Sequence, residues 1–217
     1  MGKVFFISGI DTDCGKTYIT GLLAKSIRDK GKQVITQKLV QTGCEGIADD
    51  IIEHRRLMGV ELFPEDKSGI TNPYIFKFPA SPHLSAEMEN ISIDLDVLAS
   101  TTKQLESKFE IILVEGAGGL CVPLTKSMLF IDYIAQQNHP LILVTSSKLG
   151  SINHTILSLE LCKQKNIELP IVVYNVFPDS NIQIAESSFI YLSEYIASNF
   201  PKTKLYLDSE IGSIELL

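Results

Sequence analysis

Five short, continuous runs of apolar residues recur along the chain, and each has the length of a β-strand. They cover residues 4–8, 34–38, 111–115, 141–145 and 171–175. Continuous rather than alternating apolarity is typical of strands that are covered on both faces. The pattern therefore predicts a sheet buried between two layers of other elements.

The segments between these runs alternate polar and apolar positions with the period of a helix. They cover residues 16–30, 49–58, 95–108, 131–138, 152–165 and 182–200. Gly31 and Asn166 follow two of them and are plausible stop signals. Strands that alternate with helices predict an α/β fold with a mostly parallel, twisted sheet and crossover helices on both faces.

Residues 60–90 break this rhythm. The segment contains Pro64, Pro73, Pro79 and Pro82 and shows no sustained period. Because proline removes a backbone donor, we expect no regular strand pairing here, only a long functional loop or a set of short turns.

Composition limits the class of protein. The chain has 217 residues, of which 45% are apolar, and this favours one domain over residues 1–217. The net charge of -7 argues against nucleic-acid binding through bulk positive charge. No run has the length of a membrane span, and no signal peptide is evident. The four cysteines lack zinc or disulfide spacing, so we expect a cytoplasmic protein without a membrane or nucleic-acid partner.

In open α/β sheets, ligands bind beyond the carboxyl ends of the strands. The first strand is followed by the sequence Gly9-Ile-Asp-Thr-Asp-Cys-Gly-Lys-Thr17, which opens into a helix. Gly15, Lys16 and Thr17 can supply backbone N–H donors, a cation for the outer phosphates and a hydroxyl for Mg²⁺. The spacing differs from the common phosphate loop by one extra residue between the glycines. The alternative is an ordinary strand-to-helix turn with an exposed lysine.

Charged residues also follow the second and third strands. Lys38 ends the second strand and is expected to point into the same crevice as Lys16, unless it simply caps the strand at the surface. Glu115 ends the third strand, where a carboxylate can hold Mg²⁺ beside the phosphates. Asp49 and Asp50 begin a helix, which favours carboxylates for its dipole alone. Glu115 with Thr17 and Asp50 would complete a magnesium site of hard oxygen ligands.

The segment after the fourth strand offers a second anion site. Gly150 and Ser151 open a helix whose free N–H groups could bind a carboxylate, although Ser151 could equally be an ordinary N-cap. Asn175 ends the fifth strand, where its amide could bond a base edge or simply satisfy a turn.

Several short motifs, taken together, resemble the dethiobiotin synthetase family. They are GIDTDCGKT, KLVQTG, NPY, PASPH, VEGAGG and KLGSINH, in the family's order from residue 4 to about residue 175. The extra residue in the phosphate loop is itself a feature of that family. The resemblance implies a P-loop NTPase-like fold and a homodimeric, ATP-dependent ligase of biotin synthesis. Its substrates would be 7,8-diaminononanoate (7,8-diaminopelargonate) and CO₂, with Mg²⁺ as cofactor.

The resemblance also implies residue roles. Lys38 and Lys16 would be catalytic, and Thr17, Asp50 and Glu115 would hold Mg²⁺. The nucleotide would contact Thr12, Asp13, Cys14, Gly15, Lys16, Thr17, Tyr18, Glu115, Gly116, Ala117, Gly118, Asn175 and Val176. The diamine would contact Thr42 and, across the subunit interface, Gly150, Ser151, Ile152 and Asn153.

The family chemistry proceeds through a carbamate and a carbamic-phosphoric anhydride. It asks the protein mainly to align groups and neutralise charge. One departure from the family lies after Pro201, where the usual Gly-x-[Ile/Leu]-Pro turn that helps enclose the base is missing. We therefore expect weak discrimination among nucleoside triphosphates.

Two other functions compete with this interpretation. A cobyrinic-acid-type amide synthetase usually carries an added amidotransferase domain, for which 217 residues leave no room. A partitioning ATPase often has a second lysine in its phosphate loop and sometimes a basic amphipathic tail. Here the loop carries Asp11 and Asp13, and the tail SEIGSIELL is acidic.

Overall fold

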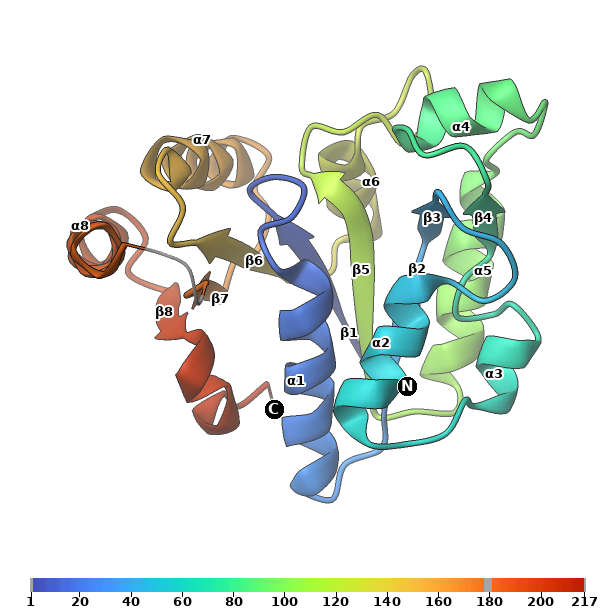
Figure 1. Cartoon of the computed structure of the whole chain (residues 1–217), viewed down its shortest axis with the longest axis horizontal. Helices are drawn as coiled ribbons and strands as arrows, with labels where there is room; N and C mark the ends of the chain where they lie inside the picture. Colours follow the sequence, from blue (N-terminus) through green and yellow to red (C-terminus); the bar gives the residue numbers. More distant parts are fainter. Residues whose placement is uncertain (1, 178–180, 217) are drawn as a thin grey trace.

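A parallel sheet of six strands forms the centre of the protein (Figure 1). The computed structural model describes residues 2–177 and 181–216. In spatial order the strands are β2 (Val34–Lys38), β5 (Ile111–Gly119), β1 (Lys3–Gly9), β6 (Leu141–Ser146), β7 (Ile171–Asn175) and β8 (Lys204–Leu207). All neighbouring pairs are parallel. The predicted α/β fold is confirmed.

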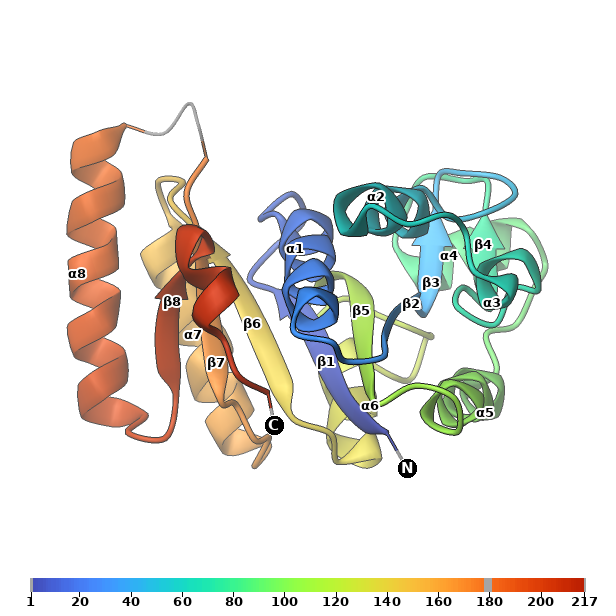
Figure 2. The same cartoon turned by 90° about the horizontal axis from the view of Figure 1, so that it is seen from below.

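Helices cover both faces of this sheet, as Figure 2 shows. One face carries α1 (Lys16–Asp29), α2 (Asp49–Met58) and a terminal 3-10 helix (Asp208–Ser213). The other face carries α5 (Leu95–Glu106), α6 (Phe130–Gln137) and α7 (Ser151–Gln164), and α8 (Ile182–Asn199) lies beside them at the β8 end. Gly31 and Asn166 have φ values of 84° and 55°, which explains the helix ends predicted there.

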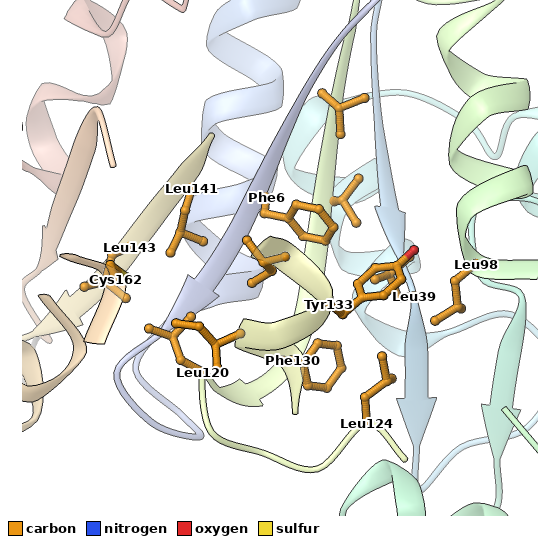
Figure 3. Close-up of a cluster of buried hydrophobic side chains, with 14 of the residues drawn as sticks. Phe6, Leu39, Leu98, Leu120, Leu124, Phe130, Tyr133, Leu141, Leu143 and Cys162 are labelled. Atoms are coloured by element: carbon orange, nitrogen blue, oxygen red, sulfur yellow. The ribbon is translucent and has the colours of Figure 1, made fainter. Parts of the chain in front are cut away.

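Alternate residues of the same strand supply the two cores. Phe6 packs against Tyr133 of α6 with ring centroids 5.9 Å apart, and Leu143 lies beside Cys162 of α7 (Figure 3). Their neighbours along the strands, such as Phe5 and Ile7, pack instead under α1. Because side chains alternate between the faces of a strand, an uninterrupted apolar run fills both cores. The sheet is thereby fixed as the rigid base of the site.

The proline-rich segment is more regular than predicted. It contains α3 (Pro64–Lys67), β4 (Tyr74–Phe76) and α4 (Pro82–Met88). β4 pairs in parallel with β3 (Val40–Thr42), so the expectation of no regular pairing is wrong. The prolines sit at N1 of α3 and α4 or flank β4, where their missing N–H groups cost no ladder bond.

The carboxyl ends of β1, β2 and β5 meet at one edge of the sheet, because the three strands are adjacent and parallel. β1 lies between β5 and β6. The strands that follow it along the chain lie first on its β5 side and later on its β6 side. Such a switch point is where open α/β sheets bind ligands. Within residues 2–177 and 181–216, every helix is too short or too polar to cross a bilayer.

Candidate functional site

The loop between β1 and α1 has the geometry of an anion cradle. Gly15 precedes the first residue of α1 with φ 99°, and no side chain caps that helix start. A Cβ atom at Gly15 would lie 2.0 Å from Nδ2 of Asn175, so only glycine fits. The first-turn N–H groups of α1 therefore have no side-chain partner and are available for phosphate oxygens.

Three side chains hold the carbonyl groups of this loop. Lys16 Nζ donates to the Asp11 carbonyl at 3.0 Å, and Lys148 Nζ donates to the Asp13 carbonyl at 2.9 Å. Asn175 Nδ2 donates to the Cys14 carbonyl at 3.0 Å. The loop is thus held from both sides by its own chain. The Asn175 N–H group, which we expected at a base edge, is used to hold the loop.

A buried group of charges lies beside this loop. Lys38 Nζ is 3.0 Å from Glu115 Oε1 and 2.6 Å from Asp50 Oδ2, and it donates to the Gly116 carbonyl at 2.9 Å. The side chain of Lys38 is 5% exposed and that of Glu115 is 0% exposed. Asp50, rather than its exposed neighbour Asp49, points to Lys38, because successive helical residues face different directions.

Burial and charge act in opposite directions on these groups. Burial raises the pKa of Glu115, but the Lys38 ammonium and a hydrogen bond from His54 outweigh it and hold that pKa well below its usual value. Burial likewise lowers the pKa of Lys38, but Glu115 and Asp50 outweigh it, and the net pKa is raised. The site therefore holds a charged lysine between two carboxylates at neutral pH.

The donor set at this point suits Mg²⁺. Thr17 Oγ1 lies 3.2 Å from Glu115 Oε1, and Asp50 approaches from α2. No group of three or more His, Cys, Asp or Glu side chains suited to a metal occurs in the part of the chain that the structure describes. Mg²⁺ is commonly held by one or two carboxylates, with the remaining ligands from phosphates and water. Two carboxylates and a hydroxyl beside a phosphate cradle fit that preference.

A cavity of about 550 Å³ opens above these groups. Many of the predicted site residues line it: Thr12, Asp13, Gly15, Lys16, Thr17, Tyr18, Lys38, Thr42, Asp50, Glu115, Ala117 and Gly118. Gly116 joins them through its bond to Lys38. Val40, Gln41, Glu53 and Phe177 also line the cavity and were not predicted as site residues.

The predicted second anion site lies elsewhere. None of Gly150, Ser151, Ile152 and Asn153 is among the cavity's lining residues, and neither are Cys14, Asn175 and Val176. Gly150, with φ 95°, precedes α7, which has no side-chain cap. The ordinary Ser151 N-cap is therefore wrong, since the Ser151 hydroxyl bonds that of Ser146 at 2.8 Å. Leu149, just before it, is 87% exposed.

His54 is a site residue that the sequence analysis missed. It is fully buried, and its Nε2 lies 2.9 Å from Glu115 Oε2. Asp50 and His54 are four residues apart on α2 and so share one helix face. The four-residue spacing was the feature of the sequence that could have identified His54. It was missed because a single histidine, without a second residue at metal-ligand spacing, is weak evidence for a site.

Comparisons with known proteins show what this chain is similar to. A family model described as an AAA domain matches residues 3–200. An ATP-dependent dethiobiotin synthetase from Haemophilus ducreyi is 53% identical over 204 residues, covering 94% of this chain and 97% of that protein. The synthetase from Pasteurella multocida is 48% identical and covers 94% and 95%. That from Chlorobaculum tepidum is 49% identical and covers 86% and 78%.

Solved structures of other proteins share the fold. The structure of pNOB8 ParA bound to nonspecific DNA superposes with a TM-score of 0.56 at 14% identity, covering 94% of this chain and 78% of that one. A ParA family ATPase from Chlorobium tepidum gives a TM-score of 0.53 at 15% identity, covering 95% and 83%. At this level of identity the likeness extends to the P-loop sheet and no further.

Proposed function

Because the chain belongs to the ATP-dependent dethiobiotin synthetases, we propose that the cavity beside Lys38 is the place where it makes dethiobiotin. The enzyme is a ligase that depends on ATP. The observation that carries the placement is the meeting of an uncapped helix start, two lysines and two carboxylates around one cavity. ATP would lie with its triphosphate on the N–H groups of α1 and Lys16 at the outer phosphates.

The reaction needs alignment more than covalent help. One amine of 7,8-diaminononanoate adds to CO₂ and gives a carbamate, releasing a proton. A carbamate oxygen attacks the γ-phosphorus of ATP, and ADP leaves. The second amine then attacks the carbonyl carbon of the mixed anhydride, closes the ring and expels phosphate. The negative charge that moves between these groups is what Lys16 and Lys38 would neutralise.

Lys38 is suited to this because three acceptors, Glu115, Asp50 and the Gly116 carbonyl, hold its ammonium at the cavity. It lies between two carboxylates, and its flexible stem ends in an ammonium with three donors. Thr42 ends β3, the short strand that begins at Val40. It lines the same cavity and would contact the diamine. Thr17, Asp50 and Glu115 would hold Mg²⁺, which when bound supplies charge for the β- and γ-phosphates.

The second anion site belongs in this proposal through a homodimer. The start of α7 carries free N–H groups and lies outside the cavity of its own chain. We assign residues 150–153 to the carboxylate of the diamine bound in a neighbouring subunit. Leu149, which is 87% exposed just before Gly150, would be covered by such a contact.

A turnover assay tests the proposal directly. Phosphate release should require both bicarbonate and 7,8-diaminononanoate, and a cyclic urea should form in equal amount. Lys38→Ala should lower kcat by about 10² or more while nucleotide binding changes little, because the lost ammonium acts on charge that develops in the reaction. Lys25→Ala, at an exposed position on α1, is the matched control. Unchanged turnover of Lys38→Ala would remove Lys38 from the mechanism.

The partitioning alternative is not favoured. Relatives at 48–53% identity are dethiobiotin synthetases, whereas ParA proteins resemble this chain at 14–15% identity in fold. Phosphate release that depended on a protein or DNA partner rather than on the diamine would restore it.

A further inference from the structure

A line of buried hydrogen bonds runs from Glu115 into the interior of the protein. Nε2 of His54 lies 2.9 Å from Glu115 Oε2, and its Nδ1 lies 3.0 Å from Thr36 Oγ1. Thr36 is on β2, one strand away from Glu115 in the sheet. All three residues are fully buried. The imidazole of His54 therefore connects the Glu115 carboxylate to the buried hydroxyl of Thr36.

The partners of Thr36 decide which ring nitrogen carries the proton. Arg55 NH1 donates to Thr36 Oγ1 at 2.7 Å, and an arginine can only donate. Among the described residues Thr36 Oγ1 contacts only Arg55 NH1 and His54 Nδ1, so its buried hydroxyl hydrogen has an acceptor only if Nδ1 accepts it. The remaining ring proton is on Nε2 and points at Glu115. His54 thus donates to the carboxylate through Nε2.

Arg55 is itself fixed, so this proton order is built into the fold. Its guanidinium donates twice to the Asp66 carboxylate, from NE at 2.8 Å and from NH2 at 2.7 Å. Asp66 also accepts from the Thr71 hydroxyl at 2.7 Å. The order of donors therefore runs from Arg55 through Thr36 and His54 to Glu115, and Asp66 in the proline-rich segment holds Arg55 in place.

The two carboxylate oxygens of Glu115 have different partners. Oε2 is taken by His54, while Oε1 faces Lys38 at 3.0 Å and Thr17 at 3.2 Å. Without a donor at Oε2, the carboxylate plane could rotate about its last torsion and move the other oxygen away from Lys38 and Thr17. We propose that His54 is a positioning residue, held as the Nε2–H tautomer by Thr36 and Arg55, that keeps Oε1 of Glu115 directed at Lys38 and Thr17.

This inference rests on the proposed roles of Glu115 and Lys38. The competing explanation is that His54 only fills space in the core. The two differ in what they require of a replacement. A space-filling role asks for volume, whereas a positioning role asks for an N–H donor at the place of Nε2.

Three substitutions separate these roles. The amide nitrogen of glutamine reaches about as far as Nε2, that of asparagine only about as far as Nδ1, and leucine has no donor. In His54→Gln we expect kcat within about threefold of the parent, and in His54→Asn and His54→Leu a loss of about 10–100-fold, as for other groups that orient ligands. Urea unfolding of each variant reports the structural cost separately. Loss of kcat that follows stability across the three variants, or full activity in His54→Leu, would overturn the proposal.

Nitrogen NMR of the imidazole gives a readout that does not depend on turnover. The ¹⁵N signals of His54 are those missing from His54→Gln, and we expect a bare Nδ1 and a protonated Nε2 in the parent. Thr36→Ser keeps the hydroxyl and should preserve the Nδ1 signal, whereas Thr36→Val removes the donor to Nδ1 and should shift that signal while Nε2 stays protonated toward Glu115. A proton on Nδ1 in the parent would overturn the inference. The same spectra with an enzyme inactive toward the diamine would instead mean that the proposed function fails.

Discussion

Two helices of this protein begin in the same way and end up in different surroundings. Gly15 before α1 and Gly150 before α7 have φ values of 99° and 95°, and neither helix start has a side-chain cap. Both therefore present free N–H groups and the positive end of a helix dipole. The shared backbone feature alone does not decide what either helix binds.

The difference lies in what the chain places around each start. The loop before α1 is held by Lys16, Lys148 and Asn175, and it faces a cavity. At Gly150 an added Cβ would meet nothing within 4 Å, and Leu149 is 87% exposed. One start is enclosed by its own chain and the other is open. One anion site is thus completed within its own chain, whereas we propose that a second subunit completes the other.

The groups beneath the two starts differ as well. Under α1 lie the charges of Lys38, Glu115 and Asp50, with His54 behind them. Under α7 lie hydroxyls, paired as Thr145 with Thr155 at 2.6 Å and as Ser146 with Ser151 at 2.8 Å. Hydroxyls do not titrate in the ordinary pH range, so the two regions should respond differently to acid.

The largest expected effect comes from a matched pair of glycine substitutions. Gly15→Ala combines a strained φ with a Cβ only 2.0 Å from Asn175 Nδ2, so we expect nucleotide affinity to fall by at least about 100-fold, or about 2.7 kcal/mol. Gly150→Ala carries the strain alone, about 1–3 kcal/mol of stability, and should leave nucleotide affinity intact. Calorimetric titration with ATP checks both. Equal losses of affinity would erase the distinction between the two starts.

A negative charge beside the exposed N-terminus of α7 should weaken the association of the two proposed subunits. Leu149→Asp should shift the protein toward monomers and raise KM for the diamine by about tenfold or more, since about 1.4 kcal/mol of lost contact has that effect. The affinity for ATP should not change, because α1 is completed within one chain. Ile190→Asp, at a 58% exposed position on α8, is the control. Sedimentation at several concentrations, with kinetics beside it, makes the measurement, and a dimer unaffected by Leu149→Asp would contradict the proposed interface.

Acid should loosen the region of α2 before that of α7. Burial raises the pKa of both Glu115 and Asp66, but Lys38 and His54 for the first, and Arg55 for the second, lower them below the ordinary values of 4.5 and 3.8. These carboxylates therefore stabilise the fold at neutral pH. That stabilisation is lost as pH falls below about 4.5, at up to about 1.4 kcal/mol per pH unit for each proton taken up.

Hydrogen exchange at pH 7 and near pH 4, corrected for intrinsic rates, checks this order. Protection should fall first in residues 49–58 and later in residues 151–164. Loss of protection in α7 first would show that the charged network is not the acid-sensitive part.

The smallest effect concerns the nucleotide base. The α1 start reads phosphates through backbone amides, the Asn175 N–H group is engaged by Cys14, and Val176 is 38% exposed. We expect kcat/KM for ATP, GTP and CTP to differ by less than about tenfold, which corresponds to 1.4 kcal/mol. A strong preference for ATP in turnover assays would mean that another element recognises adenine.

The sequence predicted those parts of the fold whose hydrophobic pattern is long enough to be recognised. The buried strands were predicted because both faces of each are covered, as Phe5 and Phe6 show by entering different cores. β3, β4 and β8 were missed because they have three or four residues each, too few for a period to appear. The pairing of these strands depends on contacts with neighbouring segments of the fold. A local sequence pattern carries no information about those contacts.

The candidate site divides in the same way. Lys38 and Glu115 were found because each ends a buried strand at the ligand edge of the sheet, and they do meet. Asp50 could be chosen over Asp49 only with the helix orientation in hand. His54 and its link to Thr36 depend on the packing of α2 against β2, which no spacing in the sequence records.

Mixing two inactive variants tests most directly whether each active site combines one chain's α1 cavity with the neighbour's α7 start. Lys38→Ala impairs the first and Asn153→Asp, which places a negative charge in the exposed first turn of α7, impairs the second. After subunit exchange, half of the dimers are mixed and each mixed dimer has one intact site, so activity should recover to about a quarter of the parent level. No recovery, with mixed dimers shown to be present, would contradict the shared site.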